Sequence, residues 1–386
     1  MKSSPQIDFD FMQRAIRLAM QGRGSVEPNP MVGCVIINEA RVIGQGYHQK
    51  YGQSHAEPNA LAVCTESPEG ATAYVTLEPC CHLGKQTPPC VPRLIEARVS
   101  RVVVACMDPN PQVAGKGIAQ LRAAGIQVDY GICESEAKQL AAPFFLRMAG
   151  ERARPYITLK WAQTADGKIA GPEGARLQIS NESSTRAVHQ LRSRCDAILV
   201  GINTVIADDP SLTARDVPRT RPLHRLILDT HLRTPVTSKL AQSARQIPVR
   251  IFCSELLVHT EKANVLKASG IEITGLNSIQ PGLLGLEPML RHLSPDRITH
   301  LLVEPGPTLA TRFFQDGWVD RLWVNRSTKT VDDPTAPTAA TVPADYVQTG
   351  QIELAGDTLT EYLNPRSPVF FANVPSADFL SNQTLG

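Results

Sequence analysis

The sequence predicts an α/β protein with two consecutive domains, and three observations support this prediction. Segments with strand-like and helix-like patterns alternate along most of the 386 residues, as in sheets covered by helices on both faces. A polar break at residues 150–155 separates two such series. The composition, with 42% hydrophobic and 20% charged residues, is typical of a globular protein of about two or three domains.

The N-terminal domain, residues 1–150, is expected to be a three-layer α/β/α unit. Its first helix shows apolar residues at helical spacing after Asp8, a suitable N-cap. The expected helices are 9–20, 56–64, 91–97, 117–124 and 135–148, and the expected strands are 31–37, 41–47, 71–77, 99–107 and 125–130.

The second domain is placed at residues 154–345 and is again of α/β class. The expected strands are 156–161, 197–201, 223–229, 249–252, 271–275 and 300–303, and the expected helices are 182–194, 261–269, 286–292 and 308–316. From about residue 332 the chain is rich in Pro, Thr and Ala and its periodicity is weaker. We therefore treat 346–386 as an extension that completes the second domain or is partly irregular.

Charge and hydropathy exclude several classes of partner. The net charge of +2 and the 5% aromatic content provide neither a basic stripe nor a stacking surface, so no nucleic-acid partner is expected. The longest apolar run, residues 102–107, is far shorter than the roughly 18–20 residues that span a bilayer. The early acidic residues do not fit a signal peptide, so we expect a cytoplasmic protein without a membrane partner.

The nine cysteines are an odd number in a large chain, which argues against a disulfide framework. Six of them lie in or beside apolar segments and are expected to be small buried hydrophobic residues: Cys34, Cys64, Cys106, Cys133, Cys195 and Cys253. The remaining three, Cys80, Cys81 and Cys90, lie close together in a polar, Pro-rich segment and need another explanation.

His55, Cys80 and Cys90 form a candidate zinc site, with Glu57 as the proton carrier. Zinc held by one imidazole and two thiolates keeps a fourth position open for catalysis. The pKa of a water molecule in that position falls toward neutrality. Glu57 follows His55 by two residues at a predicted helix start, and the HxE and PC elements together match the zinc-deaminase signature.

Simpler interpretations exist for each residue of this set. His55 alone is more often a surface residue at a helix end, and Cys80 alone is more often a core residue. A structural zinc site needs four protein ligands, and Cys81 or His82 could supply the fourth. The ordered combination of the motifs favours the catalytic interpretation.

Five motifs in order resemble the RibD family, the bifunctional deaminase–reductases of bacterial riboflavin biosynthesis. They are PNPMVGCVI at 28–36, HAE at 55–57, EPC-x-H at 78–82, TPPC at 87–90 and DPNP-x-VAGKG at 108–117. The resemblance implies a cytidine-deaminase-like fold and deamination of diaminohydroxyphosphoribosylaminopyrimidine. It also implies substrate contacts at Asn29, His48, Glu57, Lys85, Asp108 and Asn110. The loop reads GKQTPPC, one residue longer than the family pattern, because of Gln86.

The second domain lacks the GxGxxG dinucleotide fingerprint. The motif VEPGPTLA at 303–310 could place phosphates at a helix N-terminus, although alone it is more often a simple strand–helix junction. With LKWAQTADGKIA at 159–170 and residues 189–215, it resembles the RibD reductase domain. That resemblance implies a dihydrofolate-reductase-like fold that uses NADPH to open the ribosyl ring to a ribityl chain.

The resemblance assigns two sets of residues in this domain. The NADP contacts are Ala162, Thr204, Asp208, Gly306, Pro307, Thr308, Leu309 and Ala310, and the substrate contacts are Arg192, Leu212, Arg215 and Glu304. Arg192 and Arg215 suit a phosphate, since guanidinium groups bind it through paired hydrogen bonds.

The second domain departs from the family at two places. Arg176-Leu177-Gln178 stands where a Ser-x-Trp is common, and residues 327–333 replace an APK-x-x-GG segment. The leading hypothesis is a homo-oligomeric enzyme with both activities, zinc and NADPH, acting on a small phosphoribosyl pyrimidine. The alternatives are a deaminase whose second domain is structural, a nucleic-acid deaminase and a non-enzymatic zinc protein.

Overall fold

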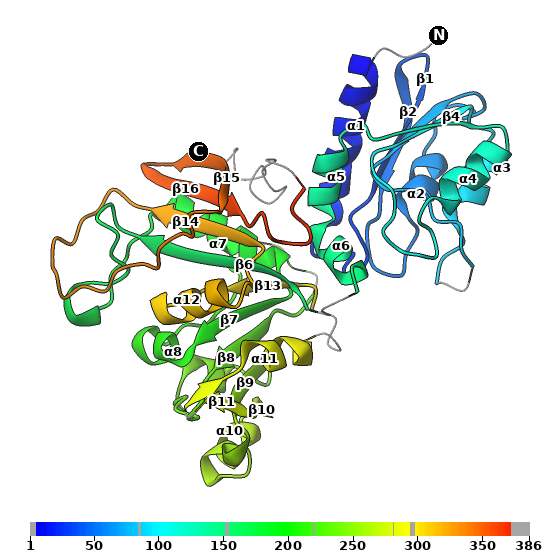
Figure 1. Cartoon of the computed structure of the whole chain (residues 1–386). Coiled ribbons are helices and arrows are strands. Elements are labelled where there is room, and N and C mark those ends of the chain that lie inside the picture. The colour runs from blue at the N-terminus through cyan, green and yellow to red at the C-terminus, as the bar shows by residue number, and fades with distance from the viewer. Residues whose placement is uncertain are drawn as a thin grey trace. The chain divides into compact units, whose positions relative to one another are not determined.

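The computed structural model describes residues 5–83, 86–150, 154–217, 219, 221–280, 282–293 and 298–371. The chain divides into two compact units, Met1–Glu151 and Arg152–Gly386 (Figure 1). Each unit contains its own central sheet, and the predicted α/β class is confirmed for both.

The sheet of the first unit has five strands in the order β2-β1-β3-β4-β5. The strands are β1 (Gly33–Asn38), β2 (Arg41–Tyr47), β3 (Thr72–Val75), β4 (Arg101–Val104) and β5 (Gln127–Tyr130). β1 is antiparallel to both of its neighbours, whereas β3, β4 and β5 run parallel. The carboxyl ends of the parallel strands β3 and β4 therefore lie at one edge, where ligand sites of α/β proteins commonly form.

Helices cover both faces of this sheet. They are α1 (Pro5–Ala19), α2 (Ala56–Ala62), α3 (Cys90–Glu96), α4 (Lys116–Ala123), α5 (Glu134–Leu140) and α6 (Ala142–Met148), with a short 3₁₀ turn, η1, at Met20–Gly22. A Cβ on Gly33 would meet the backbone oxygen of Ala15 in α1 at 2.0 Å, and one on Gly46 would meet the backbone nitrogen of Ala60 in α2 at 2.5 Å. Because side chains alternate between faces along a strand, α1 and α2 pack on opposite faces.

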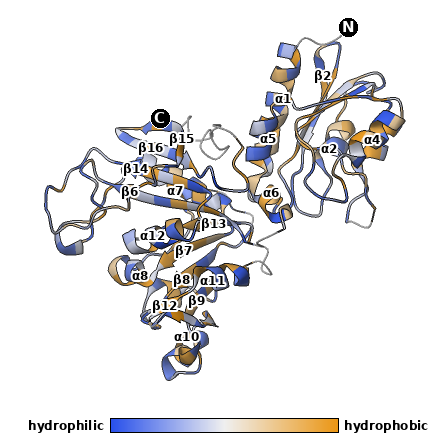
Figure 2. Ribbon diagram, in the orientation of Figure 1, coloured by the Kyte–Doolittle hydropathy of each residue, from blue (hydrophilic) through white to orange (hydrophobic). Residues whose placement is uncertain are grey.

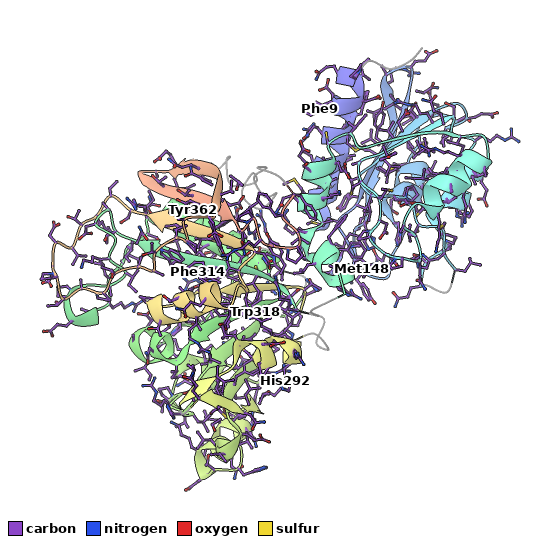
Figure 3. The ribbon with its side chains drawn as sticks, viewed as in Figure 1. Phe9, Met148, His292, Phe314, Trp318 and Tyr362 are labelled. Carbon is purple, nitrogen blue, oxygen red and sulfur yellow. The ribbon has the colours of Figure 1, made fainter. Side chains whose placement is uncertain are left out.

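The expected helix 135–148 is wrong as a single element. The structure has two helices, α5 and α6, with a break at Ala141. Pro143 lies in the first turn of α6, where its missing N–H costs nothing, whereas in a continuous helix it would remove an internal hydrogen bond. The break allows α6 to take its own direction, and Met148 at its end is labelled in Figure 3.

The second unit contains a nine-stranded sheet in the order β10-β9-β8-β7-β13-β6-β14-β16-β15. Its strands are β6 (Tyr156–Gln163), β7 (Ala197–Gly201), β8 (His224–Leu228), β9 (Val249–Ser254), β10 (Glu272–Leu276), β13 (His300–Val303), β14 (Arg321–Arg326), β15 (Val347–Leu354) and β16 (Asp357–Leu363). β16 is antiparallel to β14 and β15, and the other neighbours are parallel. The segment that we treated as an extension therefore supplies two strands of this sheet.

The helices of this unit lie on both faces of its sheet. They are α7 (Glu182–Arg194), α8 (Ile202–Asp208), α9 (Lys239–Gln242), α10 (Glu261–Ala268), α11 (Leu286–Leu293) and α12 (Pro307–Gln315), with 3₁₀ turns η2 (Pro172–Gly174) and η3 (Glu255–Leu257) and a small hairpin of β11 (Ser278–Gln280) and β12 (Leu283–Leu284). In β7, Leu199 packs in the core under α11 and α12, whereas Ile198 and Val200 pack in the core under α7 and α10. The central strands are accordingly apolar on both faces (Figure 2).

The structure also places the six cysteines that were expected to be buried. Cys34, Cys106, Cys195 and Cys253 are buried, but Cys64 and Cys133 are only partly buried. The expectation is therefore wrong for these two. Cys64 follows the end of α2, and Cys133 precedes α5 in a left-handed backbone conformation, so each lies at a helix end rather than inside an element. Within the described residues, no helix is both long and apolar enough to cross a membrane.

Candidate active sites

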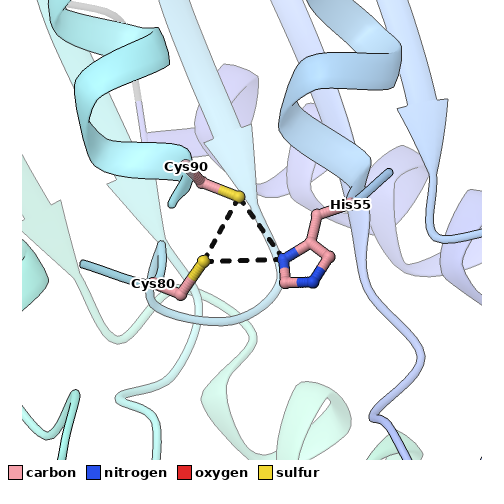
Figure 4. A group of neighbouring side chains, drawn as sticks. All are labelled: His55, Cys80 and Cys90. Carbon is pink, nitrogen blue, oxygen red and sulfur yellow. Dashed lines mark hydrogen bonds between the residues drawn. The ribbon is translucent and has the colours of Figure 1, made fainter. Parts of the chain in front are cut away.

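Three metal-ligating side chains converge in the first unit (Figure 4). His55 Nδ1 lies 3.5 Å from Cys80 Sγ and 3.4 Å from Cys90 Sγ, and the two sulfur atoms are 3.4 Å apart. A tetrahedral zinc with bonds of about 2.3 Å to sulfur and about 2.05 Å to nitrogen would separate these atoms by about 3.6–3.8 Å. The ligand atoms are thus within a few tenths of an ångström of a zinc-binding arrangement, and the donor set fits the metal.

Two of the three ligands lie at helix starts, and Cys80 lies in the segment between β3 and α3. His55 is the N-cap of α2, and Cys90 is the first residue of α3. The backbone N–H groups of Cys90 and Val91 both donate to the carbonyl oxygen of Cys80, at 3.0 and 3.2 Å. This contact fixes the Cys80 turn against the start of α3, where the helix dipole favours a thiolate.

Thr87 is a functional candidate that the sequence analysis missed. Its Oγ1 lies 3.2 Å from His55 Nε2. Because Nδ1 faces the sulfur atoms, Nε2 carries the proton and donates to Thr87. Such a contact fixes the tautomer and the ring orientation of a ligating histidine. The signal was present in the TPPC motif, where only the cysteine was interpreted.

Glu57 lies beside the ligands and is 2% exposed. Its Oε2 is buried and has no hydrogen-bond partner among the described residues. Burial, with a further contribution from the charge of Cys80, raises the pKa of this carboxyl group. A buried acceptor without a partner, next to an open metal position, is the arrangement expected of a group that exchanges a proton with a bound water molecule.

The two candidate fourth ligands do not join this cluster. Within the part of the chain that the structure describes, the group with mutually close ligand atoms consists of His55, Cys80 and Cys90. Burial raises the pKa of the Cys81 thiol, which disfavours its thiolate form. His82 Nδ1 is buried and has no hydrogen-bond partner in the described part of the chain. Three protein ligands with an open position favour a catalytic over a structural metal site.

A cavity of about 390 Å³ opens over the metal site. Its lining includes Asn29, His48, Glu57, Asp108 and Asn110, so the structure brings five of the predicted substrate-contacting residues together. Lys85, the sixth, lies outside the described residues. The lining also includes residues that the sequence analysis did not single out: Tyr51, Gln53, Thr87, Phe144, Arg147 and Met148.

Hydrogen bonds fix the orientation of the His48 ring. Its Nδ1 lies 3.0 Å from the carbonyl oxygen of Ser54, and its Nε2 lies 3.2 Å from Nδ2 of Asn29. Because Nδ1 must donate to the carbonyl, Nε2 accepts from the amide. The Asn29 carbonyl oxygen is thereby directed as an acceptor toward other partners.

Glu78, in the EPC motif, has a structural role. This buried carboxylate accepts from the backbone N–H groups of Asp108, Gly115 and Ile118, at 3.3, 2.9 and 3.1 Å. It therefore ties the turn that carries Cys80 to the loop that carries the predicted substrate contacts.

A second cavity, of about 840 Å³, lies in the second unit. Nine of the residues predicted there line it: Ala162, Arg192, Thr204, Asp208, Leu212, Arg215, Glu304, Gly306 and Pro307. Leu309 and Ala310 are buried in the core, and Thr308 is exposed. Only the backbone of these three, at the start of α12, could contribute to a phosphate site.

Arg192 and Glu304 form a partly buried bidentate ion pair in this cavity. Arg192 Nε and Nη2 lie 2.7 Å from the two carboxylate oxygens of Glu304, and Nη1 donates to the Thr213 carbonyl. Burial alone would raise the pKa of Glu304, but the guanidinium overrides it and holds that pKa at about 2. Arg192 is thus bound to Glu304. The predicted role in phosphate binding is better met by Arg215, which is exposed.

Lys160 is another residue that the sequence analysis missed, although it lies within the LKWAQTADGKIA motif. It lines the same cavity, and burial lowers the pKa of its ammonium group despite the opposing charge of Glu304. The departures from the family pattern lie here too: Arg176 and Gln178 line the cavity, and Lys329 Nζ donates to the Gln178 carbonyl.

Comparisons with known proteins agree with this geometry. Residues 5–106 match the cytidine and deoxycytidylate deaminase zinc-binding region, and residues 155–338 match the RibD C-terminal domain. The riboflavin biosynthesis protein RibD of Aquifex aeolicus is 44% identical over 83% of this chain and 86% of its own. The RibD of Escherichia coli is 40% identical over 81% and 86%.

Solved structures give the same result for the fold. Acinetobacter baumannii RibD, form 2, aligns with a TM-score of 0.77 at 35% identity, covering 94% of this chain and 99% of that one. A Thermotoga maritima protein described as a diaminohydroxyphosphoribosylaminopyrimidine deaminase/5-amino-6-(5-phosphoribosylamino)uracil reductase aligns with a TM-score of 0.79 at 32% identity, covering 93% and 99%. The predicted fold class and the predicted resemblance are confirmed. The chain belongs to the RibD family of riboflavin biosynthesis proteins, in which a zinc-binding deaminase domain is joined to a reductase domain.

Proposed function

We propose that the first unit deaminates diaminohydroxyphosphoribosylaminopyrimidine and that the second uses NADPH to reduce the ribosyl group of the product to ribityl. We also propose that the protein acts in the cytoplasm as a homo-oligomer. The observation that carries the first activity is the His55–Cys80–Cys90 triangle beside the buried Glu57 Oε2, for which the described residues offer no hydrogen-bond partner. The second rests on the cavity that collects nine predicted contacts.

In the deamination, Glu57 is the group that moves protons. When bound, zinc supplies the electrophile that makes hydroxide available at neutral pH. The Glu57 carboxylate accepts a proton from the attacking water and delivers it to the ring nitrogen. It then passes the second proton of the water molecule to the amino group. That group leaves as ammonia, while the water oxygen remains on the ring carbon. The raised pKa of Glu57 suits a group that must both take and return a proton.

Substrate orientation in this site falls to Asn29, His48, Asp108 and Asn110, which line the cavity beside Glu57. A pyrimidine edge offers both donors and acceptors, and side-chain amides can match both. The Asp108 carboxylate accepts from the backbone N–H of Asn110 at 2.8 Å. That bond holds the Asp108 carboxylate against the backbone of Asn110.

When bound, NADPH would supply the hydride that reduces the anomeric carbon. The bond from that carbon to the ring oxygen breaks, and the ring oxygen must take a proton. Lys160 lines the cavity and has a lowered pKa, so we assign the proton delivery to it. Glu304, held ionised by Arg192, would bind ribosyl hydroxyl groups. The N-terminus of α12, where Gly306 leaves open space for phosphate, would receive the dinucleotide.

The test supplies the purified protein with each substrate separately. Release of ammonia from the diamino substrate, with one zinc per chain by metal analysis, is the expected result for the first unit. A fall in nicotinamide absorbance with the deaminated substrate is expected for the second. Ammonia release without NADPH oxidation would show that the second domain is structural, and no ammonia release would overturn the deaminase assignment.

A further inference from the structure

The charged residues that line the deaminase cavity are mostly negative, as is a phosphorylated substrate. Its carboxylates are Glu57, Glu78 and Asp108. A zinc ion with two thiolates adds no net charge. Among the described residues of the lining, Arg147 is the only arginine or lysine. A phosphate monoester carries about −1.5 to −2 charges at pH 7, so this cavity needs a cation that Arg147 can provide.

Arg147 belongs to α6, the helix that the break at Ala141 separates from α5. Phe144, about one turn before Arg147, and Met148, the residue after it, also line the cavity. The Arg147 Nη1 atom lies 3.4 Å from the carbonyl oxygen of Pro28. That long bond directs the guanidinium toward the segment that carries Asn29.

The Arg147 guanidinium is otherwise uncommitted. Among the described residues it forms no ion pair, and Pro28 supplies its one hydrogen-bond partner. By contrast, Arg192 of the second unit donates from Nε and Nη2 to the two oxygens of a carboxylate. An exposed arginine is most often a solvated surface residue, but one at the rim of an active-site cavity, with Nε and Nη2 available, can form paired bonds to phosphate oxygens.

We propose that Arg147 binds the phosphate group of the deaminase substrate and sets the preference of this site for a nucleotide over a nucleoside. The inference rests on the proposed deamination. If Arg147 binds the phosphate, phosphate binding does not depend only on Lys85, which stands in the loop that Gln86 lengthens.

The experiment compares two substrates, the phosphorylated diaminopyrimidine and the same compound without its phosphate. The variants are Arg147→Gln, Arg147→Lys and Lys85→Gln. The matched control is Arg17→Gln, which changes an exposed arginine of α1 outside the cavity lining. We expect Arg147→Gln to raise KM for the nucleotide by about tenfold to a hundredfold, the loss typical of a charge-assisted hydrogen bond.

The same variant should leave KM for the nucleoside, zinc content and NADPH oxidation at wild-type values, and Arg147→Lys should restore part of the nucleotide preference. Equal changes for both substrates, or a preference lost only in Lys85→Gln, would overturn the assignment to Arg147. A wild-type protein that deaminates neither compound would instead refute the proposed function, and the inference with it.

Discussion

Substituting Gly117 with alanine should disable the metal site without touching a ligand. Gly117 is the second residue of α4, and a Cβ there would lie 2.2 Å from the carbonyl oxygen of Pro79, whereas ordinary contact begins at 3.4 Å. The turn that ends in Cys80 would have to move by about 1 Å, a displacement that can cost about 100-fold in rate. Crowding of this kind also costs roughly 1–3 kcal/mol of stability.

The assay measures zinc content and ammonia release, with NADPH oxidation by the second unit as an internal standard for folded protein. Gly125→Ala, just beyond the other end of α4, is the matched control. Its left-handed backbone makes a side chain unfavourable there, but the added Cβ would meet nothing within 4 Å. We expect Gly117→Ala to lose zinc and deamination while NADPH oxidation persists. Full zinc occupancy and wild-type deamination in Gly117→Ala would refute the steric argument.

Three further predictions concern single contacts. Glu57→Gln should keep zinc yet lower deamination by about 10²–10⁴-fold, the usual contribution of a general acid–base group; unchanged turnover would contradict its role. Thr87→Val should weaken zinc binding by about 10–100-fold through loss of the contact to His55, as measured by competition with a chelator. Arg192→Gln should cost about 3–5 kcal/mol because Glu304 stays buried without its partner. In the wild type, the stability that this pair contributes should be lost as pH falls from 4.5, the ordinary pKa of the carboxyl group, to about 2, which acid unfolding monitored by circular dichroism can check.

The metal ligands could be predicted from the sequence because their chemistry depends on residue type and on spacing along the chain. His55 and Glu57 are two residues apart at a helix start, and Cys80 lies a short distance before Cys90, which begins α3. These features are local. The TPPC motif marked the segment of Thr87, but only the structure shows that its hydroxyl contacts His55.

The second unit was less predictable in the last third of the chain, where the edge strand β15 is half-exposed. β15 (Val347–Leu354) has an irregular alternation of exposed and partly buried residues, and its place depends on pairing with β16. The sequence analysis assigned Arg192 and Arg215 the same role, and their difference was hidden for a related reason. Both are equally cationic in sequence, and only the position of Glu304 decides which one remains available.

Glu78 shows why the deaminase motifs occur as a set. Its carboxylate binds the backbone of the loop that carries Asp108, while its own turn carries Cys80. Gly117, the second residue of α4, allows that turn to approach. A displacement of the loop by substrate would therefore be transmitted to the metal ligand through short, buried contacts, and a displacement of Cys80 would reach the substrate contacts in the same way. Buried hydrogen bonds thus join the EPC motif to the DPNP-x-VAGKG motif, and the positions of Cys80 and Asp108 depend on each other.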